Sequence, residues 1–295
     1  MIIGDNREQV IKNIKQAIAR QDWDAKVEVD DPVLSLAKRQ KLVKSFWEQQ
    51  THYKGKINNR IGHLVFSTLM HSLTSSTAFT GLENLTNLPQ GGAIITVNHF
   101  NQIDSLPIKN LASKSHHDLK IVIEDTNLKL PGILCYLMNY VGTIPLIESP
   151  NYIGKEFPRH LHDALIQNKW ILIYPEQEMW WNYRKPRPLH RGAYYFAAQQ
   201  NVPVISTFIE IKTIDKLEKN HPNFYQTQYV VHVLPTIYPN FQLDVNENSK
   251  QMLAIDYQQK ITAYEKIYQR KFTPNFTPWD IAGWRYNYKS DQAYN

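Results

Sequence analysis

The stretch Ala93-Ile-Ile-Thr-Val-Asn-His-Phe-Asn-Gln-Ile-Asp104 decides the fold and the candidate site of this chain. It opens with an apolar, β-branched run over residues 93–97, which predicts a buried strand. Polar residues follow, and the segment from Ser105, with Pro107 in its first turn, predicts the start of a helix. His99 and Asp104 are therefore expected at the carboxyl end of a buried strand, where open α/β sheets place their chemistry.

The spacing of His99 and Asp104 has two interpretations. Of the eleven histidines, only His99 is followed by an aspartate five residues later. In one interpretation His99 packs in a loop while Asp104 caps the next helix. In the other, Asp104 fixes the tautomer of His99 and stabilises its charged form, so that the imidazole can act as a general base.

The composition is that of an ordinary globular protein with one large domain or two small ones. The 295 residues are 42% hydrophobic and 20% charged, which is ample for a sizeable core. The single cysteine, Cys135, excludes an internal disulfide and a cysteine-rich metal site, and it fits a reducing compartment. The net charge of +6 indicates an anionic partner, which could be a phosphate substrate, a lipid surface or a nucleic acid.

Residues 1–78 are expected to form a helical region that precedes an α/β domain over residues 79–295. The first residues lack the pattern of a signal peptide, and no run of 18 apolar residues predicts a membrane-spanning helix. Residues 1–60 carry twelve Lys and Arg against eight Asp and Glu. This basic surface is either a solvated helical face or one that meets anionic headgroups. The apolar pattern over 57–78 predicts either a core helix or an interfacial helix in the headgroup region.

From residue 80 to about residue 240, apolar runs alternate with helix-like patterns. The predicted strands are 93–97, 120–123, 170–174, 202–208 and 229–234. The predicted helices are 104–115, 127–140, 155–168 and 190–200, with a further one at 250–270. This alternation predicts an α/β fold with a mostly parallel central sheet flanked by helices, and residues 272–295 are expected to be an irregular tail.

A second predicted strand end carries a carboxylate. The run Trp170-Ile-Leu-Ile-Tyr leads directly into Pro175 and Glu176, so this carboxylate is either exposed in a loop or paired beside a cleft. Cations are dense a few residues later, at Arg184, Lys185, Arg187 and Arg191. They form either a solvated basic loop or a clamp for an anion.

Together these pieces resemble the glycerolipid acyltransferases, the family of 1-acylglycerol-3-phosphate and other lysophospholipid acyltransferases. The resemblance covers residues 80–210, where the order and spacing of the family's motifs agree. The matching segments are Asn98-His99 with Asp104, Gly142-Thr-Ile, Tyr174-Pro175-Glu176, Arg191-Gly192 and Val202-Pro203.

Two of the motifs depart from the family pattern. Glu148 stands where the second motif ends in arginine, and Gln177 and Met179 stand where the third has glycine and arginine. Those arginines are thought to hold the phosphate of the acceptor. The resemblance therefore leaves two alternatives: the cations of residues 184–191 replace them, or the acceptor is a different lipid or polar alcohol.

The resemblance implies transfer of a fatty acyl group from acyl-carrier protein or coenzyme A to a hydroxyl of a lysophospholipid or related glycerolipid, in phospholipid biosynthesis or remodelling. It implies His99 as general base, Asp104 as its partner and Glu176, with the nearby cations, as the acceptor-binding group. No acyl-enzyme is expected, because no serine or cysteine is placed as a nucleophile.

The expected partners are a thioester donor, a lipid acceptor and a membrane surface, with peripheral attachment on the cytoplasmic side. No metal, cofactor or nucleic acid is expected. The alternative function is a catalytically idle lipid- or acyl-carrier-binding protein of the same fold. A nucleic-acid-binding protein is a weaker alternative, because no recognisable motif for it is present.

Overall fold

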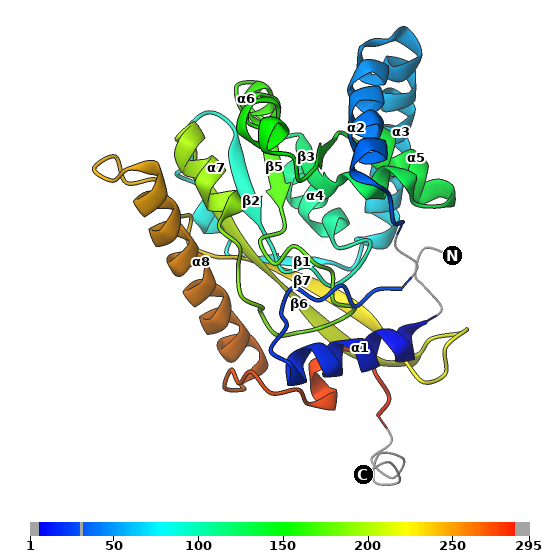
Figure 1. Cartoon of the computed structure of the whole chain (residues 1–295). Coiled ribbons are helices and arrows are strands. Elements are labelled where there is room, and N and C mark those ends of the chain that lie inside the picture. The colour runs from blue at the N-terminus through cyan, green and yellow to red at the C-terminus, as the bar shows by residue number, and fades with distance from the viewer. Residues whose placement is uncertain (1–5, 30–31, 287–295) are drawn as a thin grey trace.

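The computed structural model describes residues 6–29 and 32–286 and places a seven-stranded sheet at the centre of the molecule (Figure 1). The strand order is β1-β7-β6-β2-β5-β3-β4. The strands are β1 (Ala78–Thr80), β2 (Ala93–Thr96), β3 (Leu119–Glu124), β4 (Thr143–Leu146), β5 (Trp170–Ile173), β6 (Val204–Leu217) and β7 (Tyr225–Val233). Neighbouring strands are parallel except for the β6–β7 pair. The predicted α/β fold with a mostly parallel sheet is confirmed.

Helices cover both faces of this sheet. They are α1 (Arg7–Ala19), α2 (Leu36–Thr51), α3 (Tyr53–Leu73), α4 (Ser105–Lys114), α5 (Gly132–Tyr140), α6 (Phe157–Leu165), α7 (Gly192–Gln200) and α8 (Val245–Tyr268). Ile95 and Leu172 share one buried cluster with residues of α3 and α4, whereas Ile94 and Ile171 share another with residues of α6 and α7. A strand that is covered on both faces has a continuous apolar sequence. This is why β2 and β5 could be predicted from the sequence.

The structure corrects the prediction at several elements. Strand β6 extends well beyond the predicted 202–208 and pairs with β7. The predicted helix over 127–140 is divided into the 3₁₀ turn η2 (Asp125–Lys129) and α5, because Pro131 cannot donate a helical hydrogen bond. The edge strands β1 and β4 were not predicted, and β4 contains Pro145, which is tolerated at a sheet edge.

The N-terminal helices α2 and α3 lie beside α5 at one side of the sheet, and α8 lies along the opposite side (Figure 1). Phe66 and Met70 of α3 are buried in the core, so this helix is a core helix on one face. Gly62 permits its close approach to α5, since a Cβ there would lie 2.6 Å from the carbonyl oxygen of Tyr140. None of the helices in the described ranges is long and apolar enough to cross a membrane.

The expected division into residues 1–78 and 79–295 stays a prediction, with β1 beginning at Ala78. Between residues 272 and 286 the chain is irregular apart from the short 3₁₀ helix η4 (Pro278–Asp280). The rest of the expected tail, 287–295, and the N-terminal positions 1–5 and 30–31 lie outside the described residues.

Candidate active site

The turn that follows β2 brings His99 and Asp104 together. Nδ1 of His99 lies 2.8 Å from Oδ2 of Asp104, and the backbone N–H groups of Phe100 and Asn101 donate to the same oxygen at 2.9 and 3.1 Å. Asp104 stands at the N-cap position of α4, but its side chain makes no capping hydrogen bond to that helix. The Asp104 side chain is 2% exposed and that of His99 is 20% exposed, so only the imidazole is within reach of a substrate.

Tyr174, at the end of β5, is a third member of this group. Its hydroxyl donates to Oδ1 of Asp104 at 2.6 Å, and its ring stacks on the imidazole of His99 with centroids 3.8 Å apart. Burial, followed by the charge of Asp104, raises the pKa of Tyr174 well above its usual value, so the hydroxyl stays a donor. The signal for this role was present in the sequence, because tyrosine stands where the resembling motif has phenylalanine.

Asn98 anchors the turn after β2 to the neighbouring strand β6. Its side-chain Nδ2 donates to the carbonyl oxygen of Ile209 at 3.1 Å, and its Oδ1 accepts from the N–H of Ile209 at 2.8 Å. Asn98 is 2% exposed, and these two bonds continue the β2–β6 pairing past the end of β2. The chain therefore leaves the sheet in one direction, which places His99 beside Asp104.

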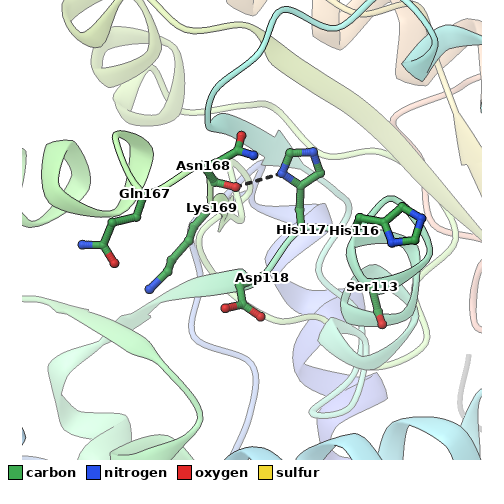
Figure 2. A pocket seen from close by; sticks show the side chains of 7 residues that line it. All are labelled: Ser113, His116, His117, Asp118, Gln167, Asn168 and Lys169. Atoms are coloured by element: carbon green, nitrogen blue, oxygen red, sulfur yellow. Dashed lines mark hydrogen bonds between the residues drawn. The ribbon is translucent and has the colours of Figure 1, made fainter.

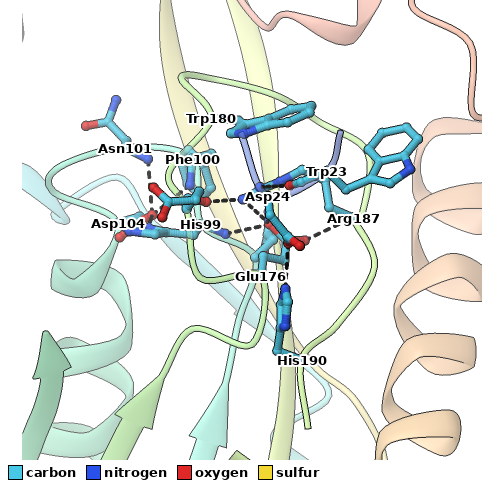
Figure 3. Close-up of polar contacts among 12 residues, drawn as sticks. Trp23, Asp24, His99, Phe100, Asn101, Asp104, Glu176, Trp180, Arg187 and His190 are labelled. Atoms are coloured by element: carbon cyan, nitrogen blue, oxygen red, sulfur yellow. Dashed lines mark hydrogen bonds and ion pairs between the residues drawn. The ribbon is translucent and has the colours of Figure 1, made fainter. Parts of the chain in front are cut away.

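Glu176 joins the His99 turn to the loop that follows β5 (Figure 3). One carboxylate oxygen accepts from the backbone N–H of His99 at 3.2 Å, and the other accepts from the N–H of Arg187 at 3.0 Å. The guanidinium of Arg187 lies 3.2 Å from Glu176, and both side chains are almost fully buried. Burial lowers the pKa of Arg187, and the charge of Glu176 opposes this effect. Pro175 adds a carbonyl that accepts from the N–H of His190 at 2.7 Å.

The other predicted cations of this loop divide into buried and exposed groups. Arg184 donates to Thr213 Oγ1 at 2.8 Å and also to backbone carbonyls, and Lys185 donates to Asp280 Oδ2 at 2.8 Å. Both are buried, whereas Arg191 is exposed, 5.9 Å from the ring centroid of Tyr195. An acceptor phosphate would have to compete with protein groups for Arg184, Lys185 and Arg187, and Arg191 is the exposed cation of the predicted four.

Three other motif residues have positions away from His99. Gly142, with φ +83°, precedes β4, and Pro203 precedes β6, so both lie at the amino ends of their strands. Gly192 begins α7. Glu148 follows the carboxyl end of β4 and is exposed. The structure thus brings His99, Asp104, Glu176 and Arg187 together, whereas Gly142 and Pro203 lie at the amino ends of their strands.

The segment between α1 and α2 crosses the same loop, and sequence reasoning missed this contact (Figure 3). The carbonyl of Trp23 accepts from Arg187 at 3.2 Å, and Asp24 lies 2.6 Å from Nε2 of His190. Trp23 also stacks on Trp180, which is fully buried with its Nε1 donating to a backbone carbonyl of this segment. No local pattern in the sequence signals this contact, because Trp23 and Arg187 are far apart along the chain.

The chemistry of the site rests on these side chains. Among the described residues, no group of three or more His, Cys, Asp or Glu lies together as metal ligands would. Cys135 is half-buried on α5, with Sγ 3.4 Å from the carbonyl oxygen of Leu128. A histidine whose Nδ1 faces a carboxylate keeps Nε2 available to accept a proton, which is the arrangement of a general base.

The model of the acyltransferase family matches residues 77–210. This segment is an acyltransferase-family domain. It extends from β1 into β6 and contains the His99–Asp104 pair and Glu176, so the family that the motifs predicted is confirmed. No curated protein matches the chain. Among solved structures, the chain is similar to the crystal structure of the 1-acyl-sn-glycerophosphate (LPA) acyltransferase, PlsC, from Thermotoga maritima. That likeness has 13% identity and a TM-score of 0.48, over 80% of this chain and 99% of that chain.

Proposed function

We propose that this acyltransferase domain moves a fatty acyl group from an acyl-carrier-protein or coenzyme A thioester to a hydroxyl of a lysophospholipid or related glycerolipid. The observation that carries the proposal is the contact of His99 with Asp104, 2.8 Å between Nδ1 and Oδ2, inside the matched segment. The hydrogen bonds that Asp104 accepts hold it as an oriented partner of the imidazole.

In the proposed reaction, Nε2 of His99 takes the proton of the acceptor hydroxyl while its oxygen attacks the thioester carbonyl. Asp104 stabilises the imidazolium that forms. The tetrahedral intermediate then expels the thiolate, which takes the proton from His99, so an ester bond replaces the thioester bond. Backbone N–H groups near a helix start are the proposed donors to the oxyanion. No acyl-enzyme is formed in this scheme.

The charged residues around the site bear on which molecule accepts the acyl group. Glu176 is held between His99 and Arg187, so its proposed role is to organise the acceptor side of the site rather than to bind a free cation. The exposed carboxylate of Glu148 disfavours a phosphate monoester at the end of β4. This supports a glycolipid or a lysophospholipid with a phosphodiester headgroup over lysophosphatidic acid, with Arg191 as the cation available for contact.

A panel of acceptors tests this function. Labelled acyl-carrier protein and acyl-coenzyme A would be offered with lysophosphatidic acid, glycerol 3-phosphate, other lysophospholipids and glycolipids, to native protein and to His99→Ala. We expect transfer to at least one acceptor and its loss in the variant. No transfer on any acceptor, or transfer that is indifferent to His99, would favour the alternative of an idle lipid- or acyl-carrier-binding protein, which the altered second and third motifs already suggest.

We also propose that the protein attaches peripherally to the cytoplasmic face of a membrane through α3. Ile57, Ile61 and Leu64 are 39%, 47% and 68% exposed on this helix, and exposed Lys56 and Arg60 lie beside them. Apolar side chains flanked by cations are typical of a helix that lies in the headgroup region.

Vesicle sedimentation of the full chain tests this attachment. The double substitution Ile61→Glu with Leu64→Glu should abolish binding, because it places two carboxylates on the proposed contact face. The matched control is Ile255→Glu, which changes a residue that is 39% exposed on α8 and should leave binding unchanged. Equal binding by both variants would contradict the proposal.

A further inference from the structure

A group of cations lies at the amino ends of β3 and β5, at the opposite end of these parallel strands from His99. Its members are Lys109 on α4, Lys120 on β3, Lys169 just before β5 and His63 on α3, and we call it the basal cation cluster. Within the described part of the chain, Asp118 is the one carboxylate whose charge acts on the pKa of His63, Lys109 and Lys120. Positive charge is therefore in clear excess here.

Lys109 shows that this excess is not satisfied by the protein. The residue is 7% exposed, and its ammonium lies 3.9 Å from Oδ1 of Asp118, which is beyond hydrogen-bond distance. Among the described residues, Asp118 is the one carboxylate within 4 Å of this ammonium. The Asp118 side chain is 71% exposed, so water screens much of its charge. A lysine that is so deeply buried normally has a closely bonded partner.

Lys120 and His63 meet beside Gly142. A Cβ placed on this glycine would lie 3.2 Å from Nζ of Lys120 and 3.3 Å from Cε1 of His63, so ammonium and imidazole share one small space. Burial and then the charge of Lys169 lower the pKa of Lys120 to about 8. Burial and then the charges of Lys109 and Lys120 lower the pKa of His63. The charge of Lys169 thus disfavours the charged forms of Lys109, Lys120 and His63.

A polar pocket of about 400 Å³ opens beside Lys169 of this cluster (Figure 2). Every residue that lines it is polar or charged: Ser113, His116, His117, Asp118, Gln167, Asn168 and Lys169. The pocket shares Lys169 with the basal cation cluster, and it is also lined by Asp118, the carboxylate 3.9 Å from Lys109. A pocket that offers hydroxyl, amide and ammonium donors and is lined mostly by polar surface suits an anion with several acceptor oxygens.

We propose that the basal cation cluster and this pocket bind a phosphate group. A phosphate would accept hydrogen bonds from Lys109, Lys120 and Lys169, and its negative charge would offset their mutual repulsion. The phosphate can belong to a free phosphate compound or to a lipid headgroup. The position of His63 on α3, beside the exposed apolar side chains of Ile61 and Leu64, favours the headgroup. This site is independent of the proposed acyl transfer.

Inorganic phosphate is the probe for the site. Native protein, Lys120→Gln and the control Lys250→Gln, which changes an exposed lysine of α8, would be titrated by calorimetry and thermal unfolding, with chloride at equal ionic strength as reference. We expect phosphate to bind native protein and Lys250→Gln and to raise their Tm. In Lys120→Gln the affinity should fall about tenfold, the loss of one charge-assisted hydrogen bond.

Without phosphate, Lys120→Gln should be at least as stable as native protein, because one of the repelling charges is gone. This readout separates a ligand site from a structural lysine. A lower Tm of phosphate-free Lys120→Gln, or a phosphate response that is absent or identical in all three proteins, would overturn the proposal.

Vesicles distinguish the two sources of phosphate. Phosphatidylcholine vesicles with and without phosphatidic acid would be sedimented with the same three proteins. Retention that increases with phosphatidic acid, and that Lys120→Gln alone loses, identifies a lipid headgroup. A phosphate titration that depends on Lys120 without any such retention identifies a soluble phosphate compound, and both results support the site.

Discussion

The two ends of the central sheet differ in how their buried charges are satisfied. At the carboxyl end, Asp104 accepts hydrogen bonds from two backbone N–H groups and from Tyr174, and it faces His99. Glu176 is paired with Arg187. At the amino end, Lys109 is equally buried, yet its nearest carboxylate is 3.9 Å away.

This difference indicates different tasks for the two ends. A general base must be held in one orientation, so the protein supplies partners for the carboxylates of Asp104 and Glu176 beside it. A site that receives an anion leaves its cations without protein partners until the ligand arrives. Substitutions at the two ends should therefore differ in effect. At the carboxyl end they remove a partner that the protein supplies, and at the amino end they remove a cation that a ligand would neutralise.

The largest effect is expected from Asp104→Asn. The amide cannot stabilise the imidazolium of His99 and favours the wrong tautomer, so kcat of acyl transfer should fall by roughly 10³- to 10⁴-fold. Steady-state kinetics on the accepted substrate measure this. The control Asp163→Asn changes an exposed acid of α6 and should keep native activity. A loss below tenfold in Asp104→Asn would mean that the pair is structural.

Arg187→Met should be the most destabilising change at the carboxyl end. It leaves the carboxylate of Glu176 buried without its cation, which costs about 3–5 kcal/mol of unfolding free energy. Chemical denaturation measures the loss. The double variant Arg187→Met with Glu176→Gln should regain part of the stability, because no charge is left unpaired. Native stability in Arg187→Met would show that this pair does not hold the loop.

The cations at the amino end of the sheet should make the unfolding free energy depend on pH. Folding lowers the pKa of Lys120 from 10.5 to about 8, so the unfolded chain binds more protons than the folded chain between these values. The unfolding free energy therefore rises with pH across this window, by about 3 kcal/mol. Urea unfolding in phosphate-free buffer would compare native protein with Lys120→Met at several pH values. The variant should lack this rise, and parallel pH curves would contradict the assignment.

The smallest effect is expected from Tyr174→Phe, which restores the residue of the resembling motif. The ring can still stack on His99, but Asp104 loses one donor. A hydrogen bond to a charged group is worth about 1.5–3 kcal/mol, so kcat/KM should change by about tenfold or more, with a displaced acid limb of its pH profile. Tyr195→Phe is the control on α7. An unchanged profile would remove Tyr174 from the site.

Local patterns in the sequence were enough to predict five of the seven strands of the sheet and the position of His99 after β2. The apolar runs of β2 and β5 identify strands that are covered on both faces, and the motif order identifies the family. The roles of the loop cations could not be predicted in this way. A dense run such as 184–191 looks the same whether it is solvated or buried, since the partner of Lys185 is Asp280, far along the chain.

Two other features were hidden for related reasons. The contact of Trp23 with Arg187 joins segments that have no shared local pattern. The basal cation cluster is built from single residues of α3, α4, β3 and the segment before β5, and none of them is unusual in its own context. Only the three-dimensional arrangement places these charges together.

The rate of acyl transfer by His99→Ala tests the central claim most directly. Native protein and the variant would be compared on the best acceptor, after circular dichroism and thermal unfolding have shown that both are folded. If His99 is the general base, the transfer rate of the variant should be roughly 10²- to 10⁴-fold lower, which is the contribution of a positioned general base. Transfer by the folded variant at the native rate would contradict this claim and assign the chemistry to another part of the domain.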